Sequence, residues 1–241
     1  TIKVLRFANS AYYGRSREIS EIQEAIIWIG FDALKELALN QKVYELFEKN
    51  KVIGNYSRLE LWKHSVAVAI CSKLIYRREF GWRGESIYAA GLLHNIGILI
   101  HDQFMHEKFT EILETMALQQ RNLHEIEMEE LGFTHADIAG IIAGRWALPE
   151  DLTSSIANHK NPTPLSRMSN SKSAYTLYLA DYCCQRREIG FCDTPYGDET
   201  LFRRSLRKLN IKEKAIQFIV DEVEEEIGLL ENEGWFRDDD E

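Results

Sequence analysis

The hydrophobic residues of this chain recur at the three-to-four residue spacing of amphipathic helices. Similar apolar patterns predict helices over about 60–79, 86–101, 105–119, 121–130, 134–147, 150–159, 172–188 and 211–231. An earlier helix is predicted over 21–39, where Gly30 is tolerated and the apolar face holds Ile22, Ala25, Ile26, Ile29, Ala33 and Leu37. No short segment alternates between apolar and polar positions, so the sequence predicts no strand. The expected fold class is all-α.

Prolines and polar stretches separate these helical segments. Pro149, Pro162 and Pro164 break the chain between helices. The segments NPTPLSRMSNSKS and DTPYGDET are the expected loops, at 161–173 and 193–200. The chain is therefore expected to divide into an N-terminal helical part, a helical core and a C-terminal helical extension, at 1–55, 56–190 and 191–241.

Charge and composition exclude several classes of protein. The formal net charge is −9, with 38 acidic against 29 basic residues, so the chain lacks the dense basic footprint of non-specific nucleic-acid binding. No apolar run approaches the roughly 20 residues of a membrane span, and no signal peptide is visible. Four cysteines without a CxxC pair are typical of buried thiols in a cytoplasmic protein: Cys71, Cys183, Cys184 and Cys192.

Two histidines fall on apolar helix faces. His64 shares a face with Val68 and Ile75, and His94 follows the small pair Ala90-Gly91, which would let another helix approach closely. A buried neutral imidazole needs a hydrogen-bond partner or a metal. An isolated case is more often a hydrogen-bonded core histidine, but two on adjacent helices are unusual.

Three more polar residues extend this set. His135 opens a helix after Thr134, a good N-cap, and His159 closes one, so helix capping also accounts for both. Asp181 lies on an otherwise apolar helix and needs a positive partner, which a metal can provide. Nitrogen-rich ligand sets of this kind suit iron, zinc, manganese or nickel. The remaining histidines lie among polar residues and are expected to be exposed: His101, His106 and His124.

These residues belong to longer blocks that resemble HDOD domains, the HD-related output domains. The blocks are VLRFANSAYYGRSREISEIQEAIIWIGFDALKELALN, LWKHSVAVA, AAGLLHNIGILI, LGFTHADIAGIIAGRWALPEDL, IANHKNP and LADYCC, within residues 4–185. The resemblance implies a multi-helix bundle of HD-domain type, and it also implies that helices preceding residue 1 are missing. It further implies a role in bacterial signal transduction with a signalling protein partner.

HDOD domains are similar to the HD and HD-GYP metal-dependent phosphohydrolases. By resemblance, His64 matches the first metal-binding histidine, His94 the histidine of the His-Asp doublet and Asp181 the late aspartate. His135 and His159 match the additional histidines of the two-metal HD-GYP type. The doublet's aspartate is replaced by Asn95 and the lysine that usually follows by Ile98, and no GYP segment follows His159.

Three functional interpretations stay open from the sequence. Loss of the doublet's carboxylate favours a non-catalytic signalling module that still binds a metal, because a neutral amide bridges cations poorly. The alternative is a divergent phosphohydrolase or phosphodiesterase acting on a nucleotide or cyclic dinucleotide, with the metal activating water. A haem- or redox-sensing domain is the minor third possibility, since no CxxCH motif is present.

Overall fold

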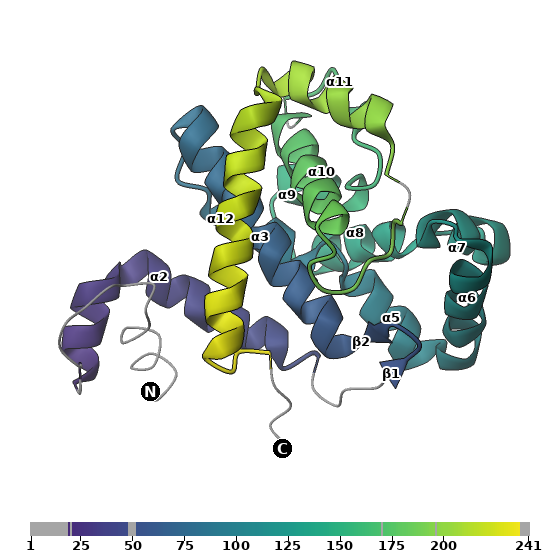
Figure 1. Cartoon of the computed structure of the whole chain (residues 1–241), viewed down its shortest axis with the longest axis horizontal. Coiled ribbons are helices and arrows are strands. Elements are labelled where there is room, and N and C mark those ends of the chain that lie inside the picture. The colour runs from purple at the N-terminus through teal and green to yellow at the C-terminus, as the bar shows by residue number, and fades with distance from the viewer. Residues whose placement is uncertain (1–18, 20, 48–51, 170, 196, 237–241) are drawn as a thin grey trace.

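The structure is a computed structural model that describes residues 19, 21–47, 52–169, 171–195 and 197–236. Helices account for nearly all the regular structure in these ranges, which confirms the expected all-α class (Figure 1). They are α2 (Ile22–Tyr44), α3 (Arg58–Phe80), α4 (Glu85–Leu93), α5 (Ile96–Phe104), α6 (His106–Gln119), α7 (Leu123–Leu131), α8 (His135–Arg145), α9 (Glu150–Ala157), α10 (Ser171–Arg186), α11 (Glu199–Leu209) and α12 (Glu213–Asn232), with a 3-10 turn η2 at Thr163–Leu165.

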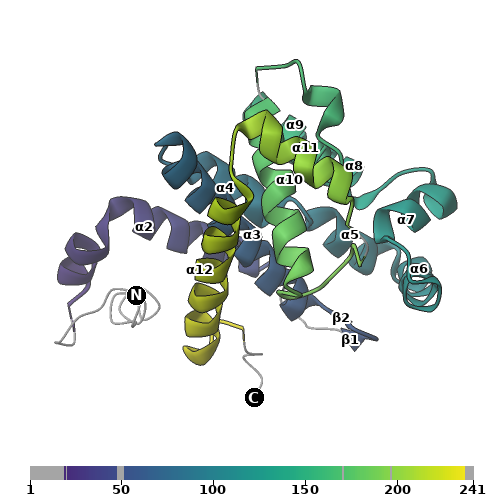
Figure 2. The same cartoon turned by 45° about the horizontal axis from the view of Figure 1, so that its top comes forward.

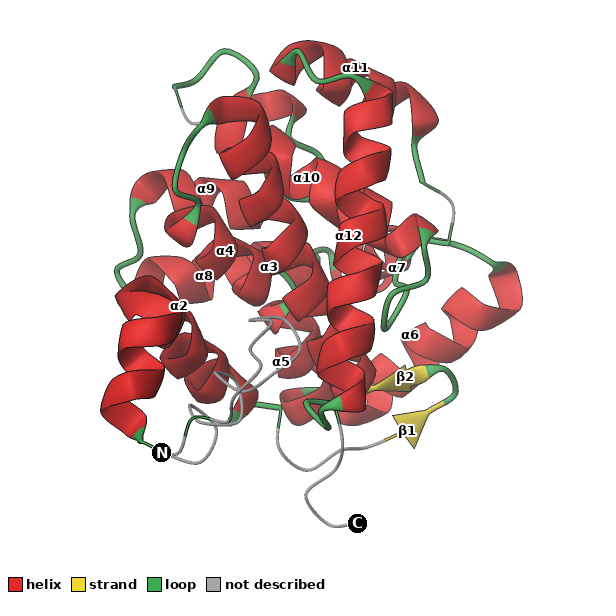
Figure 3. Ribbon diagram, turned by 60° about the vertical axis from the view of Figure 1, so that its left-hand side comes forward, coloured by secondary structure: helices red, strands yellow, loops and turns green. Residues whose placement is uncertain are grey.

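One small hairpin was not expected. The two-residue strands β1 (Val52–Ile53) and β2 (Tyr56–Ser57) pair antiparallel, with Val52 opposite Ser57 (Figure 3). Strands this short cannot produce a recognisable alternation of apolar and polar residues, so no pattern in the sequence could predict them.

Helix α3 lies at the centre of the bundle and packs against α4, α10 and α12 (Figures 1 and 2). It begins where the Ser57 side chain accepts a hydrogen bond from the backbone N–H of Glu60, and it ends at Gly81, whose φ is +67°. Most of its residues are buried on all sides, as expected of a helix enclosed by others. His64 therefore lies in the protein interior.

The close approach expected at Ala90-Gly91 is present. A Cβ at Gly91 would overlap the backbone of Ala69, so α4 and α3 meet there backbone to backbone. Only glycine allows this contact without displacing a helix. The contact brings the C-terminal end of α4, which carries His94, close to α3.

The single helix expected over 86–101 is in fact two helices. Helix α4 ends at Leu93 and α5 begins at Ile96, with His94 and Asn95 in the turn between them. Asn95, at the N-cap of α5, adopts φ −101° and ψ 14°, which is not helical, and its side chain makes no capping hydrogen bond. The break gives His94 a position at a helix end.

Other elements also differ from the expected pattern. Helix α2 is kinked at Gly30, whose φ of +82° is not helical. Helix α11 was not predicted; the Asp198 side chain caps it by accepting from the backbone N–H of Leu201. The loop expected at 161–173 contains η2, and α10 begins at Ser171, before the expected end of that loop.

The helices enclose one continuous apolar core that includes residues from α3, α4, α10 and α12. The proposed division at residues 55 and 190 stays a prediction. Cys71, Cys183 and Cys184 are buried free thiols as expected, whereas Cys192 is partly exposed. Among the helices that the structure describes, none is both long and apolar enough to cross a membrane.

Candidate metal centre

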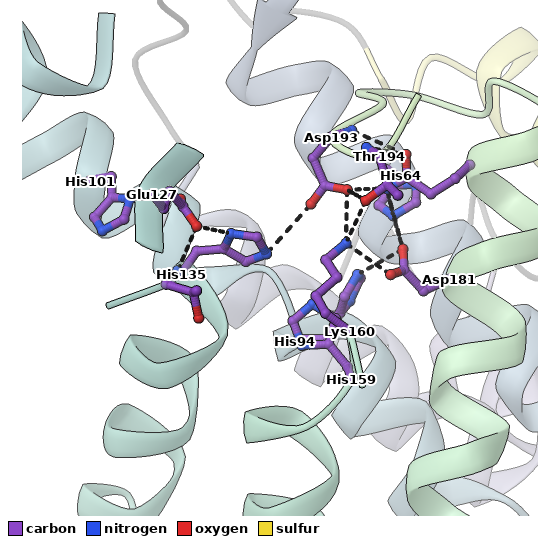
Figure 4. Close-up of polar contacts among 12 residues, drawn as sticks. His64, His94, His101, Glu127, His135, His159, Lys160, Asp181, Asp193 and Thr194 are labelled. Atoms are coloured by element: carbon purple, nitrogen blue, oxygen red, sulfur yellow. Dashed lines mark hydrogen bonds and ion pairs between the residues drawn. The ribbon is translucent and has the colours of Figure 1, made fainter. Parts of the chain in front are cut away.

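Three of the expected ligands converge inside the bundle. His64 comes from α3, His94 from the turn after α4, and Asp181 from α10. One ligand atom from each lies within 4.8 Å of the other two, and all three residues are buried (Figure 4). Residues separated by 117 positions in sequence, His64 and Asp181, are thus brought together by the packing of α3 against α10.

The Asp181 carboxylate lies between the two imidazoles. Its Oδ1 is 3.0 Å from Nε2 of His64 and 3.7 Å from Nε2 of His94. Nδ1 of His64 lies 3.1 Å from the backbone oxygen of Ile189. Because that oxygen can only accept, a neutral His64 donates through Nδ1, and its Nε2 lone pair then faces another acceptor. The Gln185 amide nitrogen lies 3.4 Å from the same nitrogen, and a metal ion between His64 and Asp181 would be bound by both side chains.

The four buried histidines of the expected set share one orientation. Each Nδ1 donates to an oxygen acceptor outside the centre, which leaves each Nε2 facing inward. The acceptors of His94 and His159 are the backbone oxygens of Gly91 and Ile156, at 2.6 and 2.7 Å. Metal-binding histidines in proteins are held in this way, because the outer hydrogen bond fixes the tautomer and aims the lone pair.

His135 and His159 lie beside the group of His64, His94 and Asp181 but are not part of it. The rings of His94 and His159 have centroids 4.9 Å apart, and those of His135 and His159 are 5.5 Å apart. His135 is the first residue of α8, behind a capping box in which Thr134 and Asp137 exchange side-chain and backbone hydrogen bonds. Thr134 therefore caps the helix as expected, and His135 is free to point inward.

Glu127 of α7 holds His135 in place. Its Oε2 accepts from Nδ1 of His135 at 2.6 Å and from the His135 backbone N–H at 2.9 Å. Its Oε1 accepts from Nδ1 of His101 at 3.0 Å. Burial alone would raise the pKa of Glu127, but the interactions with the two histidines lower it to about 2. Glu127 is therefore ionised inside the protein.

The expectation that His101 is exposed was wrong. His101 is 1% exposed, packs against Phe109 and Phe133, and bonds to Glu127. Polar sequence neighbours concealed its position, because its partner comes from α7, 26 residues later. His106 and His124 are only partly exposed. Glu127 was also missed, although it follows Leu123 and Ile126 at the spacing of a buried helix face.

Lys160 and Asp193 are further residues that the sequence pattern did not reveal. Nζ of Lys160 is 2.9 Å from Oδ2 of Asp181 and 2.8 Å from Oδ1 of Asp193. Gln185 joins the two carboxylates, because its Nε2 donates to Asp193 at 2.7 Å and to Asp181 at 3.3 Å. Its Oε1 accepts from the backbone N–H of Asp193. Asp193 lies in the loop between α10 and α11, so helical periodicity could not mark it as buried.

The electrostatic environment favours neutral histidine beside ionised aspartate. Burial lowers the pKa of His94 below its ordinary value, against the opposing effect of Asp181. Burial, reinforced by Lys160, lowers the pKa of His159 well below its usual range. Burial alone would raise the pKa of Asp181, but Lys160 and the neighbouring histidines hold it well below its ordinary value. Metal ligands require these protonation states.

The residues present fit a single transition-metal ion. His94 Nε2 is buried and has no hydrogen-bond partner among the described residues, an arrangement that costs free energy unless something binds there. Two imidazole nitrogens and one carboxylate oxygen form the donor set of zinc, iron, manganese or nickel. The site thus has three candidate ligands that lie close together: His64, His94 and Asp181.

Asn95 directly follows His94, and Ile98 comes three residues after Asn95; neither contributes a charge. Both are fully buried, and neither polar atom of the Asn95 amide has a partner in the described part of the chain. Ile98 belongs to the apolar core. The structure therefore provides neither a carboxylate nor a cation at these two positions.

A pocket of about 390 Å³ reaches the centre from one side. Lys160, Asp181 and Gln185 line it together with Tyr178 and Tyr182 of α10. Arg186 and Arg204 belong to the same lining. The pocket gives a small molecule or ion a route to Lys160 and Asp181.

Several solved structures resemble this fold. An HDOD domain protein of unknown function from Geobacter sulfurreducens superimposes with a TM-score of 0.80 at 28% identity, covering 95% of this chain and 80% of that one. A candidate signal-transduction protein from Marinobacter aquaeolei VT8 has a TM-score of 0.75 at 21% identity, covering 98% of this chain and 52% of that one.

Comparison of sequences gives one relative and one family model. An uncharacterised protein of Treponema pallidum is 24% identical over 199 residues, which cover 80% of this chain and 36% of that protein. This chain therefore spans about a third of the length of the curated relative it matches. The family model of the HDOD domain matches residues 1–162, well over half of the 241 residues. The chain belongs to the HDOD domain family.

Proposed function

We propose that this domain is a signal-transduction module that binds one transition-metal ion, does not hydrolyse phosphoesters and acts through a protein partner. One observation carries the proposal: an intact group of His64, His94 and Asp181 adjoins a buried, unbonded amide at Asn95. The metal ligands have been kept, while the acidic member of the catalytic doublet has been lost.

His64, His94 and Asp181 would hold the ion. Their inward lone pairs and the ionised carboxylate suit Fe²⁺, Mn²⁺, Zn²⁺ or Ni²⁺. A metal in such a site polarises phosphoryl oxygens and lowers the pKa of bound water. This chain's own contribution is to aim the imidazoles through the backbone oxygens of Gly91 and Ile189.

Hydrolysis would need more than these three ligands. An amide at Asn95 cannot accept a proton or bridge two cations as a carboxylate does. Ile98 lies in the apolar core, so no cation from that position reaches a phosphate. Lys160 does not compensate for this loss, because Asp181 and Asp193 already pair with its charge.

The signalling role follows from family membership and from the lost chemistry. The fold relative from Marinobacter aquaeolei carries a signal-transduction name, which agrees with this assignment. The net charge of −9 disfavours nucleic acid as the partner, so a protein is the proposed one. The free buried thiols Cys71, Cys183 and Cys184 are consistent with a reducing cytoplasmic environment.

A divergent metal-dependent phosphohydrolase is the second candidate. The intact metal ligands and the pocket of about 390 Å³ that reaches Asp181 favour it. A phosphodiester that enters this pocket would meet Lys160 and Asp181 first. The signalling module and the phosphohydrolase share the same proposed metal site. They differ in whether the chain hydrolyses a phosphoester.

Metal analysis of the purified chain tests the proposal. We expect one Mn²⁺ or Fe²⁺ per chain after loading and removal of excess ion. His94→Ala should lose most of this metal, because it removes a ligand from a set of three. His106→Ala is the matched control: His106 is a partly exposed histidine that bonds to Asp102, and the variant should keep the metal. A folded native chain that retains no ion would contradict the proposal.

A further inference from the structure

A buried ammonium lies beside the candidate metal ligands. The Lys160 side chain is 10% exposed, and its Nζ lies within hydrogen-bond distance of carboxylate oxygens of Asp181 and Asp193 (Figure 4). The hydroxyl of Thr194 is 3.5 Å from the same atom. An ammonium has three donors, and three oxygen acceptors surround this one.

Two buried carboxylates need compensating positive charge. The side chains of Asp181 and Asp193 are 5% and 0% exposed. The Lys160 ammonium lies 2.9 Å from an oxygen of Asp181 and 2.8 Å from an oxygen of Asp193. Lys160 therefore performs the electrostatic task of a bound cation.

Three further buried acceptor atoms near this pair of carboxylates have no hydrogen-bond partner in the described part of the chain. His135 Nε2, His159 Nε2 and Asp193 Oδ2 are buried and have no hydrogen-bond partner among the residues that the structure describes. His135 Nε2 is 3.5 Å from Asp193 Oδ2. The rings of His135 and His159 have centroids 5.5 Å apart, and burial of unpaired acceptors is costly. Imidazole and carboxylate are donor types that a divalent transition metal prefers.

We propose that Lys160 is a tethered cation that occupies the place of a second metal ion, and that loss of its ammonium opens a second transition-metal site on Asp193, His135 and His159. In the native chain, Lys160 limits the centre to one ion. The proposal rests on the proposed function, since the first ion is the one expected at His64, His94 and Asp181.

A purely structural salt bridge is the competing explanation. Lys160 would then only join the segment after α9 to α10 and the loop that follows. Both explanations predict that loss of the lysine weakens the fold. Only the tethered-cation explanation predicts that a metal ion replaces the missing charge. Metal stoichiometry therefore distinguishes them, without any measurement of activity.

The test compares Mn²⁺ binding to the native chain and to Lys160→Met by equilibrium dialysis with elemental analysis. Lys160→Met keeps the length of the side chain and removes its charge. We expect it to bind one Mn²⁺ per chain more than the native protein. Lys108→Met is the matched control, because Lys108 also bridges two carboxylates, Glu111 and Glu130, but at the surface. It should bind as many ions as the native chain.

A second variant locates the additional ion. Asp193→Asn, introduced into the Lys160→Met chain, should return the stoichiometry to the native value. The readout is a difference between chains, so it remains informative if the native protein binds no metal. In that case the proposed function fails, whereas a gain of one ion in Lys160→Met still supports the tethered cation.

Folding is part of the same test. If Lys160→Met folds only when Mn²⁺ is present, the ion has replaced the ammonium and the proposal is supported. If Lys160→Met folds and binds no more Mn²⁺ than the native chain, the proposal is overturned. It is also overturned if Lys160→Met stays unfolded with and without Mn²⁺.

Discussion

Gly97 of α5 lies directly against the backbone oxygen of His135, so α5 contacts the start of α8 beside the candidate metal centre. A Cβ at position 97 would overlap this oxygen. Gly97→Ala should therefore push α8 away and lower the free energy of unfolding by about 1–3 kcal/mol, a typical cost of overpacking. Urea denaturation measures this loss.

Gly144→Ala is the control for Gly97→Ala. Gly144 also lies in a helix, but the nearest atom to an added Cβ is a methyl carbon of Thr153 at 3.8 Å, which is an ordinary contact. Alanine is favoured over glycine within helices by about 1 kcal/mol. Gly144→Ala should therefore leave stability unchanged or raise it slightly. Equal destabilisation by both substitutions would contradict the packing argument.

Glu127→Gln should destabilise the protein by about 2–4 kcal/mol at neutral pH, because it removes the charged partner of buried His101 and His135. An amide can accept at one position only and would turn a donor toward the other histidine. Glu129→Gln is the control: Glu129 is an exposed partner of Arg121, and exposed ion pairs contribute about 0–1 kcal/mol. Equal unfolding midpoints for both variants would sink this prediction.

The lowered pKa of Glu127 predicts that the protein loses stability in acid. The pKa of Glu127 is about 2 in the folded protein against an ordinary 4.5. A lowered pKa means that the stabilisation is fully present above the unfolded value and is lost as the pH falls toward the folded one. The free energy of unfolding should therefore decrease from about pH 4.5 toward pH 2. In Glu127→Gln, the part of this decrease that comes from protonation of Glu127 should be absent.

Glu226 on α12 should make stability depend on pH in the opposite direction, with a loss as the pH rises. Burial, with the charges of Glu222 and Glu36 and against the effect of Lys73, raises its pKa from 4.5 to about 7. Stability from a raised pKa is fully present below about pH 4.5 and is lost as the pH rises toward 7. Glu226→Gln should therefore stabilise the protein by about 1 kcal/mol or more at pH 7, and its advantage should vanish near pH 4.

Thermal unfolding at several pH values measures the effect of Glu226→Gln. Glu225→Gln is the control, because Glu225 is an exposed neighbour on the same helix. It should change stability little across this range. A stabilisation by Glu226→Gln that is independent of pH would refute the assignment of a raised pKa.

Much of the helical architecture could be predicted from apolar periodicity. The inward positions of His64 and His94 followed from their helix faces, and the close contact at Gly91 followed from the small pair Ala90-Gly91. Thr134 was recognisable as a cap. These features depend on neighbours within a few residues, which is the range over which a sequence pattern carries information.

The missed features depend on partners distant in sequence. His101 is buried because Glu127 reaches it from another helix, and no local pattern records that contact. Asp193 is buried in a loop, where periodicity has no meaning. Lysine is usually found at the protein surface, so the sequence marks Lys160 as exposed. Only the folded chain shows two carboxylates around its ammonium. Charge pairing across elements is decided by tertiary packing.

The most direct test of the central claim, that this centre binds metal without hydrolysis, is turnover of a generic phosphodiester by the Mn²⁺-loaded native chain. Bis(p-nitrophenyl) phosphate is a suitable substrate, with His94→Ala as the reference. We predict the same background rate for both proteins. Turnover by the native chain that disappears in His94→Ala would contradict the account and establish the phosphohydrolase.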